Sequence, residues 1–487
     1  MRYRNDPEGT RLPIKLDTTT NGEFAPIPLA PVHHRARRLA LDSATTNARR
    51  LNLTRRSFLV SACGAATALL AMNAAYATGG RRGGYYDLPA AAALDMQVAR
   101  SELDRGEFVF DVQGHFVSPT GAWTRTLPPG AEPLKSFTDL RGCASASAPG
   151  LGYLQCLGAD AFIKDVFLDS DTDLVVLSFV PSTRKGEPLT IEEAAATAKI
   201  VERMEGTHRM LLHGRVNPNQ EGDLDGMDEL AARYPIAAWK TYTQWGPDGK
   251  GFFLDDDAGI AMIEKARKLG IRKVAVHKGL PFGPESYAHS TCVDIGRVAK
   301  RYPDVSFLVY HAGFVPGKPE APYDPRRSEG IDALITSLRD NGVRPGANVY
   351  AELGSTWRFL MRDPDSAAHA LGKLFKYVGE DNVLWGTDSI WYGSPQDQIQ
   401  AFRVFQISDA LAEKYGYPKI TPALRAKVFG RNALRVYSIP EDVLKKHLVA
   451  DSVAGERLAY RERADPSFVT YGPKTRREFL NLKAWGG

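Results

Sequence analysis

The sequence predicts an α/β fold, namely a (β/α)8 TIM barrel with an insert after its first strand and a C-terminal extension. Eight short apolar runs, rich in Val, Leu and Phe, recur along the chain. Such runs are typical of parallel strands that are buried on both faces. Amphipathic helical stretches separate most of them, which indicates successive βαβ units. Eight units in about 300 residues match the usual size of the barrel. A doubly wound open sheet is the alternative, and the number of strands favours the barrel.

The expected elements follow one another in a regular order. The eight strands are Glu107–Val112, Thr172–Val180, Arg209–Val216, Pro235–Lys240, Arg272–His277, Val305–His311, Asn348–Leu353 and Asn382–Asp388. The helical stretches between them are Ile191–Glu205, Gly226–Tyr234, Asp257–Leu269, Val293–Arg301, Gly330–Asp340 and Ser366–Val378. We therefore assign residues 107–438 to the barrel and residues 78–106 to a linker and N-terminal arm. Residues 439–487 form a polar extension, which we expect to cover a neighbouring surface or a second subunit of a homo-oligomer.

Residues 1–77 form a leader whose charge differs from that of the rest of the chain. Residues 1–60 hold eleven basic and five acidic residues, residues 61–77 hold no charge, and the remainder is nearly balanced. The net charge of +5 is thus confined to the leader. It does not support a nucleic-acid-binding surface.

The leader also contains the pattern of an export signal. Thr54–Leu59 reads TRRSFL, a mostly small or apolar stretch follows, and Ala75-Tyr76-Ala77 forms a cleavage site. This pattern is typical of a twin-arginine signal, with a membrane anchor or a buried helix as the alternative. We therefore expect a leader that is disordered or cleaved, the twin-arginine export machinery as a partner, and a periplasmic protein. In an oxidising compartment Cys143 and Cys156 of the insert would either pair or remain free thiols.

Polar side chains stand at the C-terminal ends of the expected strands, where this type of barrel assembles its active site. They are Gln113 and His115, Lys240, His277, His311 and Asp388. Neutral imidazoles and carboxylates are the usual ligands of a catalytic divalent metal. A single strand-end His is more often a structural residue. Three His and one Asp at equivalent positions instead indicate a metal centre.

These residues resemble the motifs of the amidohydrolase superfamily, specifically the amidohydrolase-related (amidohydrolase 2) branch of metal-dependent hydrolases and nonoxidative decarboxylases. The resemblance runs from about Phe108 to Tyr437. It is carried by Asp111–His115, His277, His311–Gly313 and Trp385–Asp388, with Gly430–Tyr437 similar to the closing helix of the family.

The resemblance implies one divalent metal held by His115, His277 and Asp388. Zinc is the expected ion, with manganese or iron as alternatives. It also implies that Asp388 and His311 are catalytic. Asp388 would contact the metal and shuttle a proton, and His311 would polarise the substrate or orient the nucleophile.

Gln113 and Lys240 leave two questions open. The family usually has His-x-His on the first strand, and some decarboxylases have Glu-x-His, whereas this chain has Gln113. Its neutral amide oxygen could ligate the metal, hold a water or do neither. Lys240 would be a ligand only if it were carboxylated between two metals. Otherwise it would bind a substrate carboxylate or pair with an acidic neighbour. Because Gln113 weakens the second metal position, we favour one metal.

The expected function is hydrolysis of a C–O or C–N bond in a small ester, lactone or amide by a metal-activated water. Decarboxylation of an aromatic or unsaturated hydroxy-acid at the same site is the alternative, and an inactive binding protein on this scaffold is the third possibility. The candidate substrate-binding residues are Lys240, Glu352, Arg184, Lys278 and Trp391. Alternatively, Glu352 would orient a ligand His, and Trp391 would pack the loops without contacting the substrate.

Overall fold

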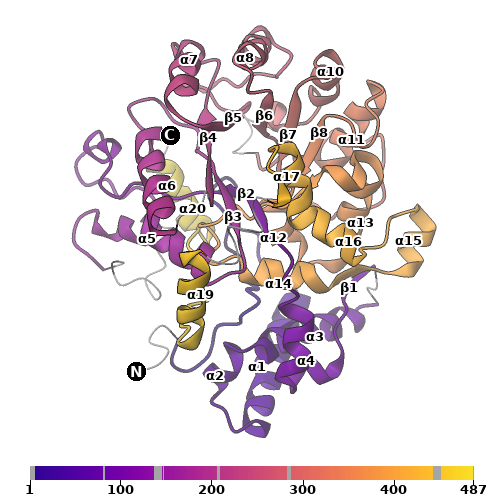
Figure 1. Ribbon diagram of the computed structural model, residues 1–487. Coiled ribbons are helices and arrows are strands. Elements are labelled where there is room, and N and C mark those ends of the chain that lie inside the picture. Colours follow the sequence, from indigo (N-terminus) through magenta and orange to yellow (C-terminus); the bar gives the residue numbers. More distant parts are fainter. Residues whose placement is uncertain are drawn as a thin grey trace.

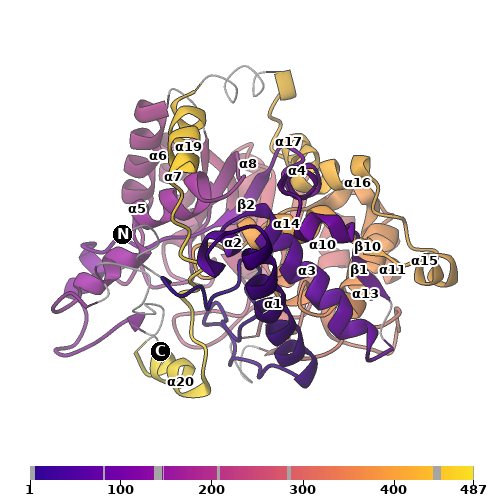
Figure 2. The same ribbon diagram turned by 90° about the horizontal axis from the view of Figure 1, so that it is seen from below.

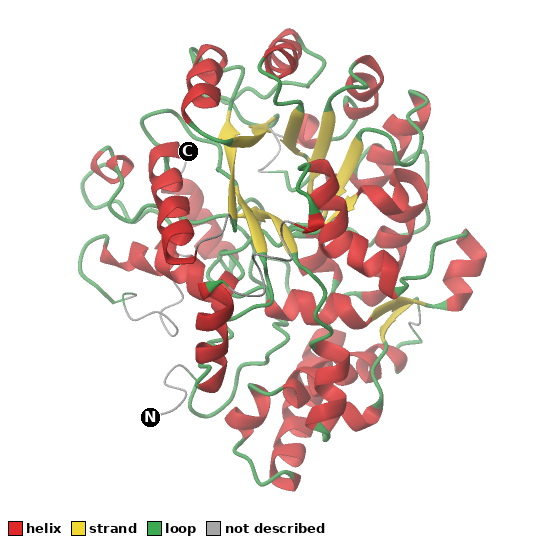
Figure 3. Ribbon diagram, in the orientation of Figure 1, coloured by secondary structure: helices red, strands yellow, loops and turns green. Residues whose placement is uncertain are grey.

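The predicted barrel is present in the structure, a computed structural model that describes residues 6–485 apart from 81–82, 136–144, 146, 206–208, 282–286 and 443–450. Eight parallel strands pair in sequence order and form a ring that helices enclose (Figure 3). The strands are β2 (Phe110–Gly114), β3 (Leu174–Leu177), β4 (Met210–Arg215), β5 (Ile236–Tyr242), β6 (Lys273–His277), β7 (Ser306–Tyr310), β8 (Val349–Glu352) and β9 (Val383–Leu384).

Strands β2 and β9 close the ring through individual hydrogen bonds beyond the end of β9. The amide of Val112 donates to Trp385 O at 3.0 Å, and the amide of Asp388 donates to Gln113 O at 3.0 Å. The buried Asp111 carboxylate accepts from the amides of Gln113 and Thr387, each at 3.0 Å. Burial raises the pKa of Asp111 to about 7, although these hydrogen bonds oppose the shift. The closure places Gln113 beside Asp388.

The helices lie around the strands, as Figure 1 shows. The helices after β3 to β8 are α6 (Ile191–Glu205), α7 (Asp223–Arg233), α8 (Asp257–Lys268), α9 (Tyr287–Ser290), α10 (Ile295–Arg301), α11 (Gly330–Asp340), α12 (Thr356–Leu360) and α13 (Pro364–Leu374). Those after β9 are α14 (Gln396–Val404), α15 (Asp409–Tyr415), α16 (Pro422–Ala426), α17 (Asn432–Val436), α19 (Ser452–Glu462) and α20 (Arg476–Trp485), and a short strand β10 (Phe405–Ile407) pairs with β1 (Gly84–Tyr86). The insert after β2 carries α5 (Ala159–Phe162). Cys156 of the insert is disulfide-bonded, and Cys143 lies outside the described residues.

The described part of the leader is folded, in contrast to the disorder expected from the sequence. Its helices are α1 (Pro31–Arg50), α2 (Arg55–Leu59) and α3 (Ala62–Ala77), and α4 (Met96–Leu103) follows. These helices form a group of their own at one side of the barrel (Figures 1 and 2). Alanines recur on α1 every four residues, at Ala36, Ala40, Ala44 and Ala48, and their small side chains are buried where α1 contacts α3.

The arginine pair of the expected export signal is divided between surface and interior. Arg56 is 1% exposed and donates to Pro466 O, with a carboxylate oxygen of Asp6 at 3.7 Å. The apolar stretch that follows forms α3, and among the described residues no helix is both long and apolar enough to cross a bilayer. Export and cleavage remain predictions.

Residues 15–24 of the leader, here called the N-terminal strap, run across the C-terminal ends of the strands. Lys15 pairs with Asp397 at 3.2 Å, and Asp17 pairs with Arg358 at 2.8 Å. The C-terminal extension holds the strap from the other side. The amide of Thr20 donates to Pro473 O at 3.0 Å, and the hydroxyl of Thr19 donates to that of Thr470 at 2.8 Å. Both ends of the chain therefore cover the barrel.

Gly472 allows this close approach. A Cβ atom added at Gly472 would lie 1.7 Å from Thr20 O, so Gly472→Ala must displace the strap. We expect a loss of about 1–3 kcal/mol in the free energy of unfolding, as for other overpacked positions. Hydrogen exchange of residues 15–24 should also become faster. The matched control is Gly455→Ala, because a Cβ at Gly455 meets nothing within 4 Å. Equal exchange of the strap in the two variants would contradict the prediction.

Candidate metal centre

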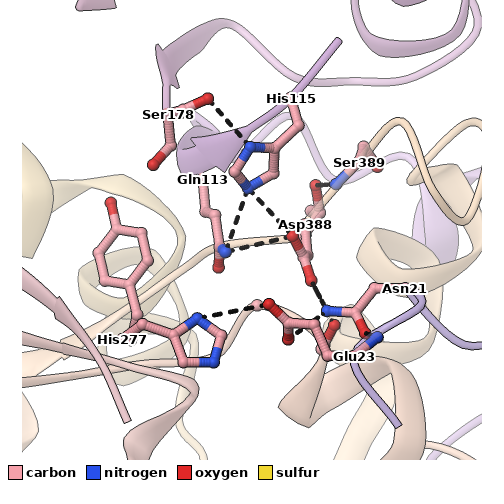
Figure 4. A network of polar contacts seen from close by, with 12 residues as sticks. Asn21, Glu23, Gln113, His115, Ser178, His277, Asp388 and Ser389 are labelled. Atoms are coloured by element: carbon pink, nitrogen blue, oxygen red, sulfur yellow. Dashed lines mark hydrogen bonds and ion pairs between the residues drawn. The ribbon is translucent and has the colours of Figure 1, made fainter. Parts of the chain in front are cut away.

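The structure brings the polar strand-end residues together at the C-terminal end of the barrel (Figure 4). His115 Nε2 lies 3.1 Å from Asp388 Oδ1. The rings of His277 and His311 pack edge to face with their centroids 4.4 Å apart. All four residues are at most 2% exposed. The constellation expected from the sequence therefore forms one buried cluster.

Hydrogen bonds fix the tautomers of two imidazoles. His115 Nδ1 lies 3.0 Å from Ser178 O, and His311 Nδ1 lies 2.6 Å from Gly354 O. A carbonyl oxygen only accepts, so each Nδ1 carries a proton, and each Nε2 presents a lone pair in the neutral form of the ring. Metal-ligating histidines are usually held in this way.

The lone pairs converge on the Gln113 amide. Gln113 Nε2 lies 3.3 Å from His115 Nε2, 3.5 Å from His311 Nε2 and 3.2 Å from Asp388 Oδ1. An amide has only two hydrogens for these three acceptors. Within the described part of the chain Gln113 Oε1 has no hydrogen-bond partner. These hydrogen-bond acceptors outnumber the available hydrogens, which fits a site for a divalent cation. His115, His311 and Asp388 would be among its ligands. Gln113 would offer its oxygen only after its amide turned over.

Burial and neighbouring charges keep this donor set in the form that binds a metal. Burial lowers the pKa of His311 to about 4, although Asp388 opposes the shift, and burial lowers the pKa of His277 well below its usual value. Burial alone would raise the pKa of Asp388. The hydrogen bond and charge of His115 outweigh burial and hold that pKa below its usual value. At neutral pH the site therefore holds neutral His277 and His311 beside an ionised Asp388.

The backbone is unusual where these residues stand. Asp388, His311 and Ser355 have φ angles of 59°, 62° and 54°, in the left-handed region. Such conformations cost roughly 1–3 kcal/mol each and cluster at functional sites. Ser355 uses its position to donate to Asp388 Oδ2 at 2.5 Å. The strained turns thus aim side chains at the centre of the cluster.

Glu352 and Lys240 lie next to the cluster and are fully buried. Glu352 accepts hydrogen bonds from the amides of His311 at 3.0 Å and Gly354 at 2.5 Å. A Cβ at Gly386 would lie 1.6 Å from Glu352 Oε1, so Gly386 leaves the room for this carboxylate. Lys240 Nζ lies over the Tyr310 ring, 3.7 Å from its centroid. Burial lowers the pKa of Lys240 and raises that of Glu352. Glu352 therefore orients the turn of His311, as in the alternative reading of the sequence.

The other candidate substrate-binding residues have different surroundings. Arg184 is half exposed and pairs with Asp223 of α7 at 2.9 Å, away from the cluster. Lys278 is fully buried and pairs with Asp294 at 2.9 Å. Trp391 stacks on the His115 ring with centroids 5.8 Å apart, so it packs a site residue. The structure thus assigns Arg184 and Lys278 to ion pairs rather than to the site.

Two residues of the N-terminal strap join the cluster and were not expected from the sequence. Asn21 Nδ2 donates to Asp388 Oδ2 at 2.9 Å, and Glu23 Oε1 lies 3.6 Å from His277 Nδ1 (Figure 4). In the sequence these two residues stand in the polar run Thr18–Glu23, and its Asn-Gly pair indicates a turn. Nothing in that run indicates a contact with strands hundreds of residues away.

A model of the amidohydrolase family matches residues 164–439, which is more than half of the chain. The chain belongs to the amidohydrolase family. His277, His311 and Asp388 lie inside the matched region of this amidohydrolase, whereas Gln113, His115 and the N-terminal strap precede it. No curated protein sequence matches the chain.

Solved structures with a similar chain course share little sequence with this amidohydrolase. The manganese-bound 5-carboxyvanillate decarboxylase of Novosphingobium aromaticivorans is 14% identical, with a TM-score of 0.44, and the match covers 69% of this chain and 98% of that chain. The 2,6-dihydroxybenzoate decarboxylase of Rhizobium is 15% identical, with a TM-score of 0.38 and coverages of 68% and 99%. A candidate 2-pyrone-4,6-dicarboxylic acid hydrolase of Pseudomonas putida is 13% identical, with a TM-score of 0.38 and coverages of 68% and 97%.

The metal-free amidohydrolase should lose stability in acid through His311. Burial disfavours the charged form and lowers the pKa of this imidazole from its ordinary value of 6.5 to about 4 in the folded chain. The unfolded state therefore binds the extra proton between pH 6.5 and pH 4. The contribution of His311 to stability is complete above pH 6.5 and is lost as the pH falls, by roughly 1.4 kcal/mol per pH unit. Denaturation in the presence of a chelator should show a shallower pH dependence for His311→Asn. The exposed His34→Asn is the control, and equal slopes for the two variants would disprove the prediction.

Proposed function

We propose that this amidohydrolase hydrolyses a C–O or C–N bond in a small organic ester, lactone or amide with the help of one divalent metal. The observation that carries the proposal is the ionised Asp388 carboxylate beside two imidazole Nε2 atoms that face the same point. A divalent ion bound there would polarise a carbonyl oxygen and lower the pKa of a water to about 7. Zinc is the proposed ion, with manganese and iron as alternatives.

Asp388 would act as the proton acceptor for the attacking water. Its Oδ2 atom is occupied by Ser355 at 2.5 Å and by Asn21 at 2.9 Å, so Oδ1 is the oxygen that faces the imidazoles. Because the pKa of Asp388 is held below its usual value, the carboxylate is ionised over the neutral range. After bond cleavage the same group would return the proton to the leaving oxygen or nitrogen.

His311 would orient the attacking water. Its Nδ1–H is committed to Gly354 O, and its amide donates to Glu352, so ring and backbone are both fixed. The remaining Nε2 lone pair is thereby held toward the ion, so His311 would position the metal and, with it, the attacking water. We favour one metal rather than two, because Gln113 stands where the family usually has a histidine and so weakens a second metal position.

A product assay separates hydrolysis from decarboxylation. The zinc- or manganese-loaded protein would be incubated with lactones, esters, amides and aromatic hydroxy-acids. Release of acid or ring opening without CO2 supports the proposal. Release of CO2 from the hydroxy-acids would replace it with a decarboxylase. A metal-loaded protein that binds members of the panel but transforms none would be a binding protein.

We also propose that the protein is exported through the twin-arginine route. The TRRSFL motif and the Ala75-Tyr76-Ala77 site support this proposal. Mass spectrometry of protein from a periplasmic fraction tests it, since cleavage removes the first 77 residues. Intact protein that is confined to the cytoplasm would exclude export.

A further inference from the structure

The N-terminal strap brings a second carboxylate to the metal centre. One ligand atom each of Glu23, His277 and His311 lie within 4.8 Å of one another, with Glu23 Oε1 3.6 Å from His277 Nδ1. We propose that Glu23 is a ligand of the divalent cation at the end of the barrel, together with His277 and His311. This inference rests on the proposed metal-dependent function and adds a ligand from outside the barrel.

The spacing of the three groups suits a single ion. Zinc binds nitrogen and oxygen at roughly 2.0–2.2 Å, so neighbouring ligand atoms of a tetrahedral site lie about 3.4 Å apart. The Glu23–His277 separation of 3.6 Å is already of that size, and a ring nitrogen of His311 lies within 4.8 Å of both ligand atoms. The Nδ1 atom of His311 is committed to Gly354 O, which leaves Nε2 as its ligand atom.

The charges of the donors also match a divalent ion. Imidazole ligands contribute no charge, and the Gln113 amide is neutral. Asp388 contributes one negative charge and Glu23 the other. Asp388 is buried and Glu23 is 15% exposed, so both carboxylates are poorly solvated and would repel each other without a cation nearby. With Glu23 in place, a divalent ion is neutralised by the chain itself.

Asn21 links the two carboxylates. Its Nδ2 group donates to Asp388 Oδ2 at 2.9 Å and to Glu23 Oε2 at 2.7 Å. The amide of Glu23 in turn donates to Asn21 Oδ1 at 3.1 Å, which closes a tight turn around Gly22. The other oxygen of Glu23, Oε1, lies 3.6 Å from His277 Nδ1. The strap is thus built to present one carboxylate oxygen.

The strap also closes the site. Thr19 and Thr20 are fully buried and Asn21 is 8% exposed, so the strap packs tightly over this side of the site. Cleavage after Ala77, if it occurs, would remove Glu23 together with this cover. Full-length and processed protein would then differ in metal affinity and in access to the site.

Metal binding by Glu23→Gln tests the inference. Titration of metal-free protein with Zn²⁺ against a competing chelator should give a Kd about 10- to 100-fold weaker than that of the unaltered chain. The visible spectrum of the Co²⁺-loaded protein should also change. The control is Glu8→Gln in the same leader, where the side chain is exposed, and it should bind Zn²⁺ normally. Glu23→Asp keeps the charge but shortens the reach, so it should also bind Zn²⁺ more weakly.

The outcomes separate this inference from the proposed function. Normal Zn²⁺ affinity and an unchanged Co²⁺ spectrum in Glu23→Gln would exclude Glu23 as a ligand. If Asp388→Asn weakened binding in the same series, the metal centre itself would stand. If the unaltered chain bound no Zn²⁺, Mn²⁺ or Fe²⁺, both ideas would fail. Unfolding temperatures of the metal-free variants verify that each is folded.

Discussion

Asp388→Asn is expected to lower the rate of hydrolysis by roughly 10²- to 10⁴-fold, the range typical of a lost proton acceptor. The amide has nearly the same shape, so it can still accept hydrogen bonds from Ser355 and Asn21 through its oxygen. It cannot accept the proton of an attacking water at neutral pH. The loss should therefore appear in kcat as well as in kcat/KM, measured on whichever ester or lactone the metal-loaded protein cleaves.

A distant carboxylate provides the control for this substitution. Asp248→Asn removes a charge from a side chain that is 61% exposed, and its kcat should equal that of the unaltered enzyme. Retention of more than a tenth of the activity by Asp388→Asn, in a sample that is folded and metal-loaded, would show that Asp388 is not the proton acceptor.

His277→Ala should weaken metal binding by 100-fold or more. The imidazole is fully buried between the Tyr242 and His311 rings, with centroids 4.6 and 4.4 Å away. Removing it deletes a donor and leaves a cavity that no other nitrogen fills. Metal content after dialysis and the Zn²⁺ Kd measure the effect.

His369→Ala is a matched control for a histidine outside the site. His369 is half-buried and its Nδ1 lies 3.1 Å from the Tyr417 hydroxyl. The His369→Ala substitution should lower the free energy of unfolding but leave the Zn²⁺ Kd unchanged. Equal metal affinity in the two variants would remove His277 from the ligand set.

The barrel and most of its site were predictable because their signals are local. Each strand is an apolar run, and each candidate ligand directly follows one, so topology alone gathers His115, His277, His311 and Asp388. The order of the strands then fixes which side chains meet. The resemblance of the sequence motifs indicated the same residues. The amidohydrolase family itself is shown by the match over residues 164–439.

The remaining features depend on contacts between distant segments. Lys278 follows a strand as the site residues do, yet it pairs with Asp294 at the start of α10. Nothing in the local sequence distinguishes such a buried ion pair from a substrate-binding group. Arg184 likewise pairs with Asp223 rather than facing the cluster.

The fold of the leader does not follow from its local sequence. The small, apolar residues of α3 suit a signal peptide, but they equally suit a helix packed against the alanines of α1. Glu23 and Asn21 lie in a polar run that looks unstructured by composition. Their role depends on the C-terminal extension, which holds the strap through Thr470 and Pro473.

The metal content of the purified full-length protein tests the central claim most directly. Elemental analysis of protein prepared without chelator should find about one equivalent of zinc, manganese or iron per chain. Treatment with a chelator should abolish both the bound metal and hydrolysis, and addition of the same ion should restore both. Protein that holds no metal after incubation with these ions, or hydrolysis that survives complete removal of the metal, would contradict a metal-dependent amidohydrolase.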